Sequence, residues 1–197
     1  ALVNWVKAGK EPPASRYPTL ASGELVAPTA AAMGWPDTPG APKPDGKLYA
    51  FHDYDFGRGY DAKTVSGAPK LQPPRIRRTL PSRVPRVNAD GNETSGVPSV
   101  QLQVPLGTYT GFNELAAGYG KGGNCVFFCG FIPFAKTKAE RAAKGDPRLS
   151  LEERYGDHAG FVAKVREAVT KQQAEGWLLP DDAARLLKEA EAANVLK

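Results

Sequence analysis

Residues 130–155 read GFIPFAKTKAERAAKGDPRLSLEERY, and along this stretch a proline-rich, irregular polypeptide gives way to a helical one. Two S/T-x-x-E patterns, beginning at Thr137 and Ser150, predict helix starts in which a hydroxyl and a carboxylate satisfy reciprocal backbone donors. Gly145 and Pro147 predict the end of the first helix, because glycine accepts a left-handed terminal conformation and proline cannot continue a helix. The stretch therefore predicts architecture and contains no chemistry of its own.

The residues after this stretch predict two antiparallel helices. Apolar side chains recur there at helical spacing in two stripes, formed by Phe161, Val162, Val165 and Val169 and then by Ala183, Leu186, Leu187 and Ala190. The break at 176–180 contains Gly176 and Pro180, and proline is well placed in a first helical turn. A short turn between two such helices predicts an αα-hairpin.

The middle of the chain is a proline-rich arm in which long helices are excluded. Fourteen of the eighteen prolines lie between Glu11 and Pro98, and proline breaks helices because it lacks an N–H donor and fixes φ. The arm holds too much apolar surface for a flexible linker, including Tyr17, Trp35, Tyr49, Phe51, Tyr54 and Phe56. We expect extended segments that wrap over another surface and are held by buried aromatics.

A β-rich patch follows the arm. The runs 83–87 and 97–104 flank Asp90-Gly91, and Asp-Gly between alternating runs predicts a β-hairpin. The fragment is therefore expected to be α+β, with a helix at its start that Gly9 ends. Its four predicted parts are the end of a core helix (1–10), the proline-rich wrapping arm (11–82), the β-hairpin with a glycine- and aromatic-rich loop (83–135) and the C-terminal helices (136–197).

Charge and hydropathy exclude several classes of protein. The formal net charge of the 197 residues is +5. One run interrupted by prolines contains five arginines and accounts for this excess, namely Arg75, Arg77, Arg78, Arg83 and Arg86. No helix, zinc spacing or aromatic RNA-binding signature accompanies this run, so we expect a solvated or internally paired face and no nucleic-acid partner. No apolar run approaches the ~20 residues that span a bilayer, so no membrane span is predicted.

The two cysteines, Cys125 and Cys129, leave the redox compartment open. In an extended strand their Cα atoms would be roughly 13 Å apart, and a disulfide requires less than about 7 Å. They can pair only if the segment coils, or one of them can pair with residues outside the chain. No second Cys or His pair lies nearby, so we expect no zinc, no other metal and no cofactor.

Catalytic motifs are missing from the sequence. It has no Gly-x-Ser-x-Gly pentapeptide, which places a nucleophilic serine at a strand-to-helix elbow. His52, flanked by Phe51 and Asp53, is a candidate catalytic base, but neighbouring strand residues point to opposite faces, so a structural imidazole is the stronger interpretation. His158 is expected at a helix start on the surface. We therefore place no catalytic residue in this chain, with His52 as the alternative.

Two acidic segments and one glycine-rich segment resemble ligand loops only in part. Asp53-x-Asp55-x-Gly57 and Asn88-x-Asp90-Gly91-Asn92 begin like calcium loops, but neither has the glutamate at position 12 that completes an EF-hand. Turn formation explains both segments. The glycine-rich segment 118–123 lacks the Gly-Lys-Ser/Thr ending of a phosphate-binding loop.

The segment 109–113 is a candidate pocket rim. Tyr109, Phe112 and Asn113 follow the expected strand, and Gly111 permits a close approach by a ligand. A packed loop anchored by its aromatic residues is the alternative interpretation. With Trp35 from the arm, these three residues are the predicted substrate-binding residues.

Several of these segments, in order, resemble a known family. They are LVNWV at residues 2–6, PPASRYP at 12–18, VPRVNADGNE at 84–93, VPLGTYTGFN at 104–113 and the long stretch 131–155. On these residues the chain resembles the C-terminal portion of a bacterial α/β-hydrolase-domain-containing family whose members are generally predicted to be exported. Departures lie mainly in 41–80 and at Cys129, which puts any shared disulfide in doubt.

The resemblance implies a serine-esterase-like fold that is an α/β hydrolase only when joined to an upstream core. The nucleophile, acid and histidine would precede Ala1, and the core would be part of the same precursor or a companion chain. The implied function is hydrolysis of a small-molecule ester or related acyl compound, with this chain covering and shaping the cleft. A chain that begins within a helical pattern, through processing or as the tail of a longer polypeptide, agrees with this. The alternative is a non-catalytic module that docks on a protein or glycan.

Overall fold

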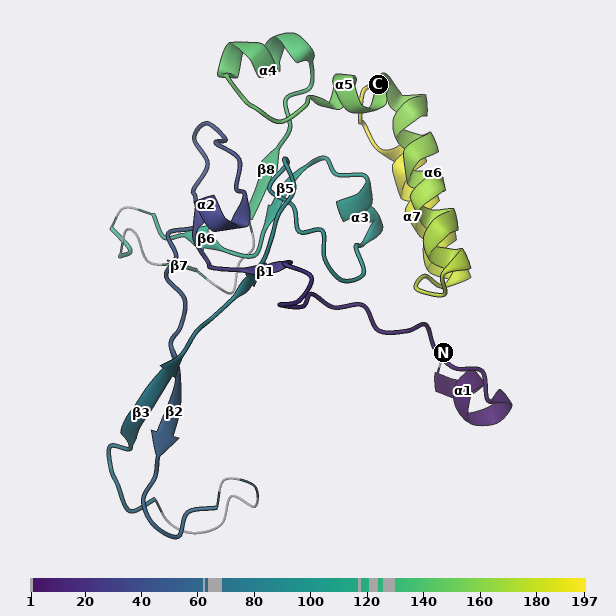
Figure 1. Ribbon diagram of the computed structural model, residues 1–197. Coiled ribbons are helices and arrows are strands. Elements are labelled where there is room, and N and C mark those ends of the chain that lie inside the picture. The colour runs from purple at the N-terminus through teal and green to yellow at the C-terminus, as the bar shows by residue number, and fades with distance from the viewer. Residues whose placement is uncertain (1, 62, 64–68, 117, 121–123, 126–129) are drawn as a thin grey trace.

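A computed structural model of the chain describes residues 2–61, 63, 69–116, 118–120, 124–125 and 130–197. It shows a mixed fold of short helices, one long helical pair and small two-stranded sheets. Figure 1 shows a central body from which two pieces project, the β2–β3 ribbon on one side and α1 on the other. The expected mixture of helices and strands is confirmed, and the body alone contains the buried core.

The core lies where the C-terminal helical pair meets the short helix α3. Helix α6 spans His158–Ala174 and α7 spans Pro180–Ala192, while α3 spans Val100–Gln103. The cluster is built from buried aliphatic residues and one phenylalanine, namely Val100, Val104, Phe161, Val165, Ala168, Val169, Ala183 and Ala190. The predicted αα-hairpin is confirmed, and most of the residues of its two stripes form this core.

Capping fixes the helices on either side of Gly145 as expected. Helix α4 spans Lys138–Lys144 and ends at Gly145, whose φ of 64° is left-handed. Helix α5 spans Leu151–Tyr155, and its first turn contains the complete capping box of Ser150 and Glu153. The box at Thr137 is only half formed, because the Glu140 carboxylate accepts from Lys136 N at 2.9 Å instead of from the N-cap N–H.

Of the four small antiparallel sheets found in the described residues, three lie in the body. Strand β5 (Gly107–Thr110) pairs with β8 (Gly130–Pro133), and β6 (Asn113–Glu114) pairs with β7 (Asn124–Cys125). Strand β1 (Leu25–Val26) from the arm pairs with β4 (Val84–Pro85). Each sheet in the body joins segments that are distant in sequence, except for the short β6–β7 pair.

The predicted hairpin around Asp90-Gly91 is wrong. Its first run pairs with the arm through β1, and a single bridge between Val87 and Glu93 is what remains of the ladder. Its second run becomes α3, because Ser99 Oγ accepts from Leu102 N and starts a helical turn. Val100 and Val104 are four residues apart, and residues at this spacing lie on one face of a strand and also on one face of a helix. The sequence pattern therefore fits both, and packing against α6 favours the helix.

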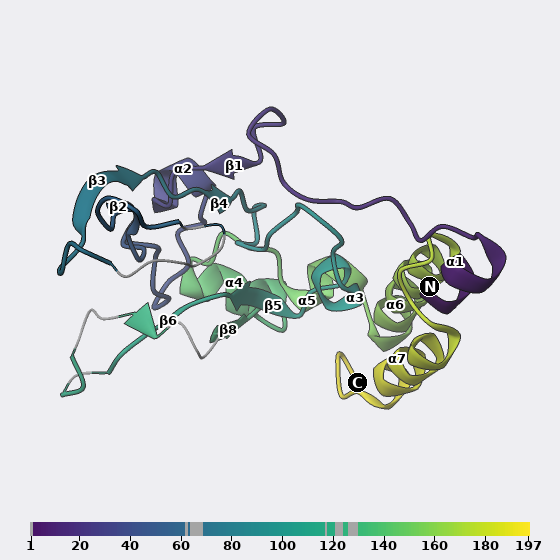
Figure 2. The same ribbon diagram turned by 90° about the horizontal axis from the view of Figure 1, so that it is seen from below.

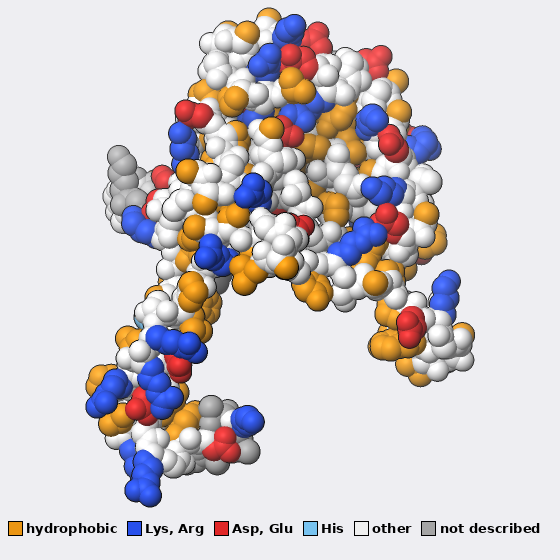
Figure 3. Space-filling view, in the orientation of Figure 1, with side chains coloured by type: hydrophobic (Ala, Val, Ile, Leu, Met, Phe, Trp, Pro, Cys, Tyr) orange, Lys and Arg blue, Asp and Glu red, His pale blue; other side chains and the backbone are white. Residues whose placement is uncertain are grey.

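The projecting ribbon consists of β2 (Phe51–Asp55) and β3 (Arg75–Leu80). Cross-strand ion pairs join Arg77 to Asp55 and Arg78 to Asp53, each at 3.3 Å. Arg75, Arg83 and Arg86 are exposed, so the run fits the expectation of a solvated or internally paired face. Residues 51–86 contain eight Lys and Arg against three Asp, so the whole net charge of +5 lies on this segment. Figure 3 shows basic side chains together with exposed apolar ones on the projection.

The arm and α1 bury little of their apolar surface. Tyr17, Tyr49 and Phe51 are 69%, 72% and 66% exposed, so their expected burial against another surface stays a prediction. Helix α1 spans Leu2–Ala8 and ends at Gly9 as predicted, with no buried residue. Figure 2 shows the arm running from α1 along one side of the molecule to β1 and α2 (Ala30–Met33).

Two remaining expectations concern the cysteines and the membrane. Cys129 lies outside the described residues, and of Cys125 only the backbone pairing in β7 is described, so the pairing of the two thiols stays open. Among the helices in the described ranges, none has the length and hydropathy needed to cross a bilayer.

Candidate functional site

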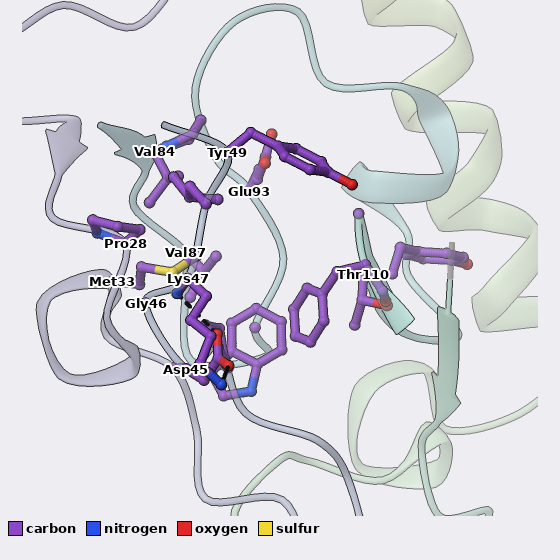
Figure 4. Close-up of a pocket in the computed structure, with 18 residues that line it drawn as sticks. Pro28, Met33, Asp45, Gly46, Lys47, Tyr49, Val84, Val87, Glu93 and Thr110 are labelled. Carbon is purple, nitrogen blue, oxygen red and sulfur yellow. Dashed lines mark hydrogen bonds and ion pairs between the residues drawn. The ribbon is translucent and has the colours of Figure 1, made fainter. Parts of the chain in front are cut away.

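Three segments that are far apart in the sequence enclose a cavity of about 440 Å³ in the body. They are the arm between Pro28 and Tyr49, the segment from Val84 to Glu93 and the end of β5 from Tyr109 to Phe112. Figure 4 shows these residues around one space. The volume lies within the range of small-molecule sites, which are concave and mostly apolar with a few polar groups.

The first wall of the cavity is held in place by α2. Thr29 Oγ1 caps this helix by accepting from Ala32 N at 3.3 Å, and Gly34 ends it with a left-handed φ of 78°. The chain reverses direction at Gly34, and the backbone N–H of Trp35 donates to the Ala30 carbonyl at 2.9 Å. A single helical turn with two good caps thereby fixes the direction in which the tryptophan leaves the arm.

The second wall is joined to the first through the backbone. Val87 N donates to the Met33 carbonyl at 3.0 Å, directly after the β1–β4 pair. The turn that follows is closed by Asn88, whose side-chain oxygen accepts from Asp90 N at 2.9 Å and Asn92 N at 3.1 Å. The interpretation of this acidic segment as a turn is therefore supported, and Glu93 leaves it towards the cavity.

The third wall is fastened to that turn by the fully buried side chain of Asn92. Its Nδ2 donates to the Gly107 carbonyl at 3.0 Å, and its Oδ1 accepts from Tyr109 N at 2.8 Å. Thr108, between these two residues, donates its hydroxyl to the Asp90 carbonyl. β5 is therefore bonded to the turn on one edge and to β8 on the other, and these bonds fix the backbone position of Tyr109.

A buried arginine supports the same strand from the side of β8. Arg148 Nη1 donates to Thr108 Oγ1 and to the Ile132 carbonyl, both at 2.9 Å, and its Nη2 lies 2.7 Å from an Asp146 carboxylate oxygen. Burial alone would raise the pKa of Asp146, but the hydrogen bonds and charge of Arg148 outweigh it and hold that pKa below its usual value. The pair stays ionised and satisfies the backbone around Pro133.

Aromatic rings dominate the lining of the cavity. The rings of Trp35 and Phe112 lie 5.8 Å apart between centroids and are tilted by 49°, a spacing at which aromatic pairs attract. Tyr109 packs its ring on Phe131 at 5.2 Å. Thr110 is buried and donates its hydroxyl to the Phe112 carbonyl at 2.6 Å, which holds the turn that carries the phenylalanine.

Charged groups in the lining are few. Lys47 Nζ lies 2.9 Å from the Asp45 carboxylate, and the hydrogen bond and charge of Asp45 raise the pKa of Lys47. Glu93 is the third charged side chain in the lining. The cavity therefore offers a large apolar area, an ion pair and one further carboxylate to a bound molecule.

Three of the four predicted substrate-binding residues meet at this cavity. Trp35, Tyr109 and Phe112 all line it, although Trp35 is more than seventy positions from the other two. Asn113 does not; it begins β6, is exposed and turns its side-chain oxygen to Glu114 N at 2.9 Å. Met33, Tyr49 and Glu93 were not anticipated, because nothing in the sequence shows which arm residues reach the aromatic loop.

His52 lies away from this cavity on the projecting ribbon. Its Nδ1 is 3.1 Å from Thr79 Oγ1, and its ring packs edge-on against Tyr54. The neighbouring Asp53 pairs with Arg78 instead. This arrangement fits the structural interpretation of His52, and a catalytic role stays an untested alternative.

His158 lies at the start of α6 and contacts the C-terminal end of the chain. The two ring nitrogens of His158 lie 2.9 and 3.2 Å from the carbonyl oxygens of Val195 and Glu191, so this histidine fastens the C-terminal residues to α6. In the portion of the chain that the structure describes, no three His, Cys, Asp or Glu side chains gather closely enough to hold a metal ion.

Comparison with known proteins adds one finding. The family described as alpha/beta hydrolase domain matches residues 1–188, which is nearly the whole chain. No curated protein and no solved structure matches it significantly. The match agrees with the sequence resemblance and says nothing about which residues act.

Proposed function

Since the chain belongs to the alpha/beta hydrolase domain family, we propose that it is the C-terminal part or subunit of a serine hydrolase that cleaves esters or related acyl compounds. In this proposal a catalytic core outside these residues provides the serine nucleophile, the histidine base and its orienting acid. The present chain covers the cleft and contributes part of the substrate pocket. The observation that carries the proposal is the cavity lined by Trp35, Tyr109 and Phe112.

The lining of the cavity is suited to binding the acyl or alcohol part of a substrate and not to catalysing the reaction. Its walls are aromatic and aliphatic, and such surfaces bind apolar substrate parts by excluding water. Within the described residues it contains no histidine, serine or cysteine that could act as base or nucleophile. A role in binding the substrate, next to a core that performs the reaction, follows from this lining.

The exposed apolar side chains on the two projections support the proposal that a large partner packs against this chain. Leu2, Val3 and Val6 of α1 are 67%, 63% and 77% exposed, and Ile76 on the ribbon is 51% exposed. Leu2, Val3 and Val6 are exposed together on one short helix, and exposed apolar patches mark contact sites in soluble proteins. A two-stranded ribbon is marginally stable alone. A hydrolase core that packs between the ribbon and α1 would cover both projections.

Activity-based labelling of the native assembly tests this proposal. The chain is purified from its source without denaturation and treated with a fluorophosphonate, which modifies activated serine hydroxyls. We expect the label on a polypeptide that carries a Gly-x-Ser-x-Gly elbow and stays associated with, or continuous with, this chain. Intact-mass spectrometry then identifies that polypeptide. A preparation in which these residues fold cooperatively as an isolated monomer, with no labelled serine, contradicts the proposal.

The exposed ribbon also favours a second candidate, a non-catalytic module that docks on a protein or glycan partner. The carrying observation is a net charge of +3 on residues 51–80, which have six Lys and Arg against three Asp, together with the exposed Phe51 and Leu80 on the same projection. The two candidates differ in the labelling experiment, because the module would bind its partner without any labelled serine. Export, which the resemblance implies, stays a prediction that fractionation of the source cells would test.

A further inference from the structure

Glu93 is the one charged side chain of the cavity lining that lacks a partner among the described residues. Its backbone is fixed by the bridge to Val87, so its position beside the cavity is determined by the fold. The side chain is exposed, and within the described part of the chain it forms no hydrogen bond or ion pair. A carboxylate held on an apolar cavity without a counter-ion is available to a ligand.

The other two charges of the lining do not neutralise Glu93. Asp45 and Lys47 pair with each other at 2.9 Å. Figure 4 shows Glu93 next to Tyr49 on one side of the cavity, with the Asp45–Lys47 pair on another side. The ion pair contributes no net charge, so the three charged side chains of the lining sum to a formal charge of −1, and this charge lies on Glu93.

The aromatic lining adds to this preference. The faces of aromatic rings are the negative part of their quadrupole, so cations are attracted to them and carboxylates are not. Four aromatic residues line the cavity, namely Trp35, Tyr49, Tyr109 and Phe112. The rings and Glu93 therefore favour the same sign of charge in a ligand.

We propose that Glu93 is a specificity-determining residue that makes this cavity select molecules with a cationic amine beside an apolar body and reject carboxylates. The proposal rests on the proposed function, because it names the class of substrate that the same cavity would accept. Esters with an ammonium group in either the acyl or the alcohol part belong to this class. Free carboxylic acids, which are ionised at neutral pH, do not.

Three probes of nearly equal size and different charge test the proposal. They are phenethylamine, which is cationic at pH 7, 2-phenylethanol, which is neutral, and phenylacetate, which is anionic. Each is titrated into the native assembly at low ionic strength, and binding is followed by the indole N–H signal of Trp35 and by calorimetry. We expect the amine to bind about threefold more tightly than the alcohol, and about tenfold more tightly than the carboxylate. Added salt should reduce both ratios.

Two matched variants assign the preference to Glu93. Glu93→Gln keeps the size of the side chain and removes its charge, so the three probes should bind with nearly equal affinity. Glu11→Gln removes an exposed carboxylate that does not line the cavity, and it should leave the ratios unchanged. The backbone amide spectrum of each variant shows whether the fold is retained.

The outcomes separate this inference from the proposed function. Equal binding of the three probes to the unmodified protein, or a preference for the amine that persists in Glu93→Gln, overturns the role of Glu93 and leaves the cavity as a ligand site. If none of the probes perturbs Trp35 at millimolar concentration, the cavity does not bind such ligands at all, and its place in the proposed function falls with the inference.

Discussion

The side-chain oxygen of Asn92 accepts a 2.8 Å hydrogen bond from the backbone N–H of Tyr109, in a position from which water is fully excluded. The same amide donates to the Gly107 carbonyl at 3.0 Å. One buried side chain therefore satisfies backbone groups on both sides of Thr108. It couples the turn that precedes Glu93 to the strand that carries the aromatic wall of the cavity.

Replacing this amide should destabilise the fold as a whole. Asn92→Ala leaves a buried N–H and a buried carbonyl without partners, and each such group costs about 1–3 kcal/mol. We expect the free energy of unfolding to fall by about 2–4 kcal/mol in urea titrations. Asn4→Ala, which removes an exposed amide from α1, should change it by less than about 0.5 kcal/mol. Equal effects of the two substitutions would show that the Asn92 bonds are not essential.

The buried pair of Arg148 and Asp146 predicts a larger effect than any surface pair. Arg148→Ala removes five donors from a buried site and leaves the Asp146 carboxylate uncompensated, which typically costs about 3–5 kcal/mol. Arg166→Ala breaks an exposed pair with Glu191 and should cost less than about 1 kcal/mol. Thermal unfolding of the two variants gives the comparison, and a similar loss in both would contradict the assignment of Arg148 to the interior support of β5.

The capping box of α5 predicts a pH dependence of stability. Hydrogen bonds from Ser150 and the nearby Arg141 guanidinium lower the pKa of Glu153 from 4.5 to about 2. In the unfolded chain the carboxylate becomes protonated near pH 4.5, whereas in the folded chain it stays ionised. Its contribution is therefore fully present above about pH 4.5 and is lost as the pH falls towards 2.

A comparison with Glu153→Gln isolates this contribution. The difference in free energy of unfolding between the protein and the variant should be largest at pH 5 to 6 and should shrink as the pH approaches 2, because the protonated carboxyl group resembles the amide. Urea titrations at a series of pH values measure it. A difference that stays constant over this range would mean that Glu153 keeps its ordinary pKa in the folded chain.

Local signals were sufficient to predict the four C-terminal helices, α4 to α7. Thr137, Ser150, Gly145 and Pro180 act on the backbone within four residues of themselves, so their effects do not depend on the rest of the fold. The strand pairings could not be predicted in the same way. β4 pairs with β1, about sixty residues earlier, and nothing local distinguishes that partner from the run beyond Asp90-Gly91. Packing against α6 then decided that Val100–Gln103 is helical.

The candidate site could be predicted only where it is continuous in sequence. Tyr109 and Phe112 follow a recognisable strand and were expected on a pocket rim, and both line the cavity. Tyr49 and Glu93 reach it because the arm folds back through α2 and because the turn at Asn88 bends the chain. Arm residues of this kind have no periodic pattern, so sequence alone does not give their neighbours.

The close pairing of β5 with β8 gives a prediction about two glycines. A Cβ on Gly107 would lie 2.4 Å from the Ile132 carbonyl oxygen and 2.9 Å from Pro133 Cα, and these backbone atoms have no room to move. Gly107→Ala should therefore separate the strands and cost at least about 2–3 kcal/mol. Gly111→Ala meets no atom within 4 Å and should be close to neutral. Proteolysis of the two variants under native conditions measures the loosening, and equal resistance would contradict this packing.

Phe112 and Asn113 were both predicted to bind substrate, but the structure gives them different surroundings. Phe112 lines the cavity and pairs its ring with Trp35, whereas Asn113 is exposed and binds its own backbone neighbour. Phe112→Leu should weaken the binding of 2-phenylethanol by about three- to tenfold, because it removes an aromatic contact worth about 0.5–1.5 kcal/mol. Asn113→Ala should leave the affinity unchanged. Titrations followed by the Trp35 indole signal measure both variants. If Asn113→Ala weakens binding as much as Phe112→Leu, the ligand lies over β6 and the cavity is not its site.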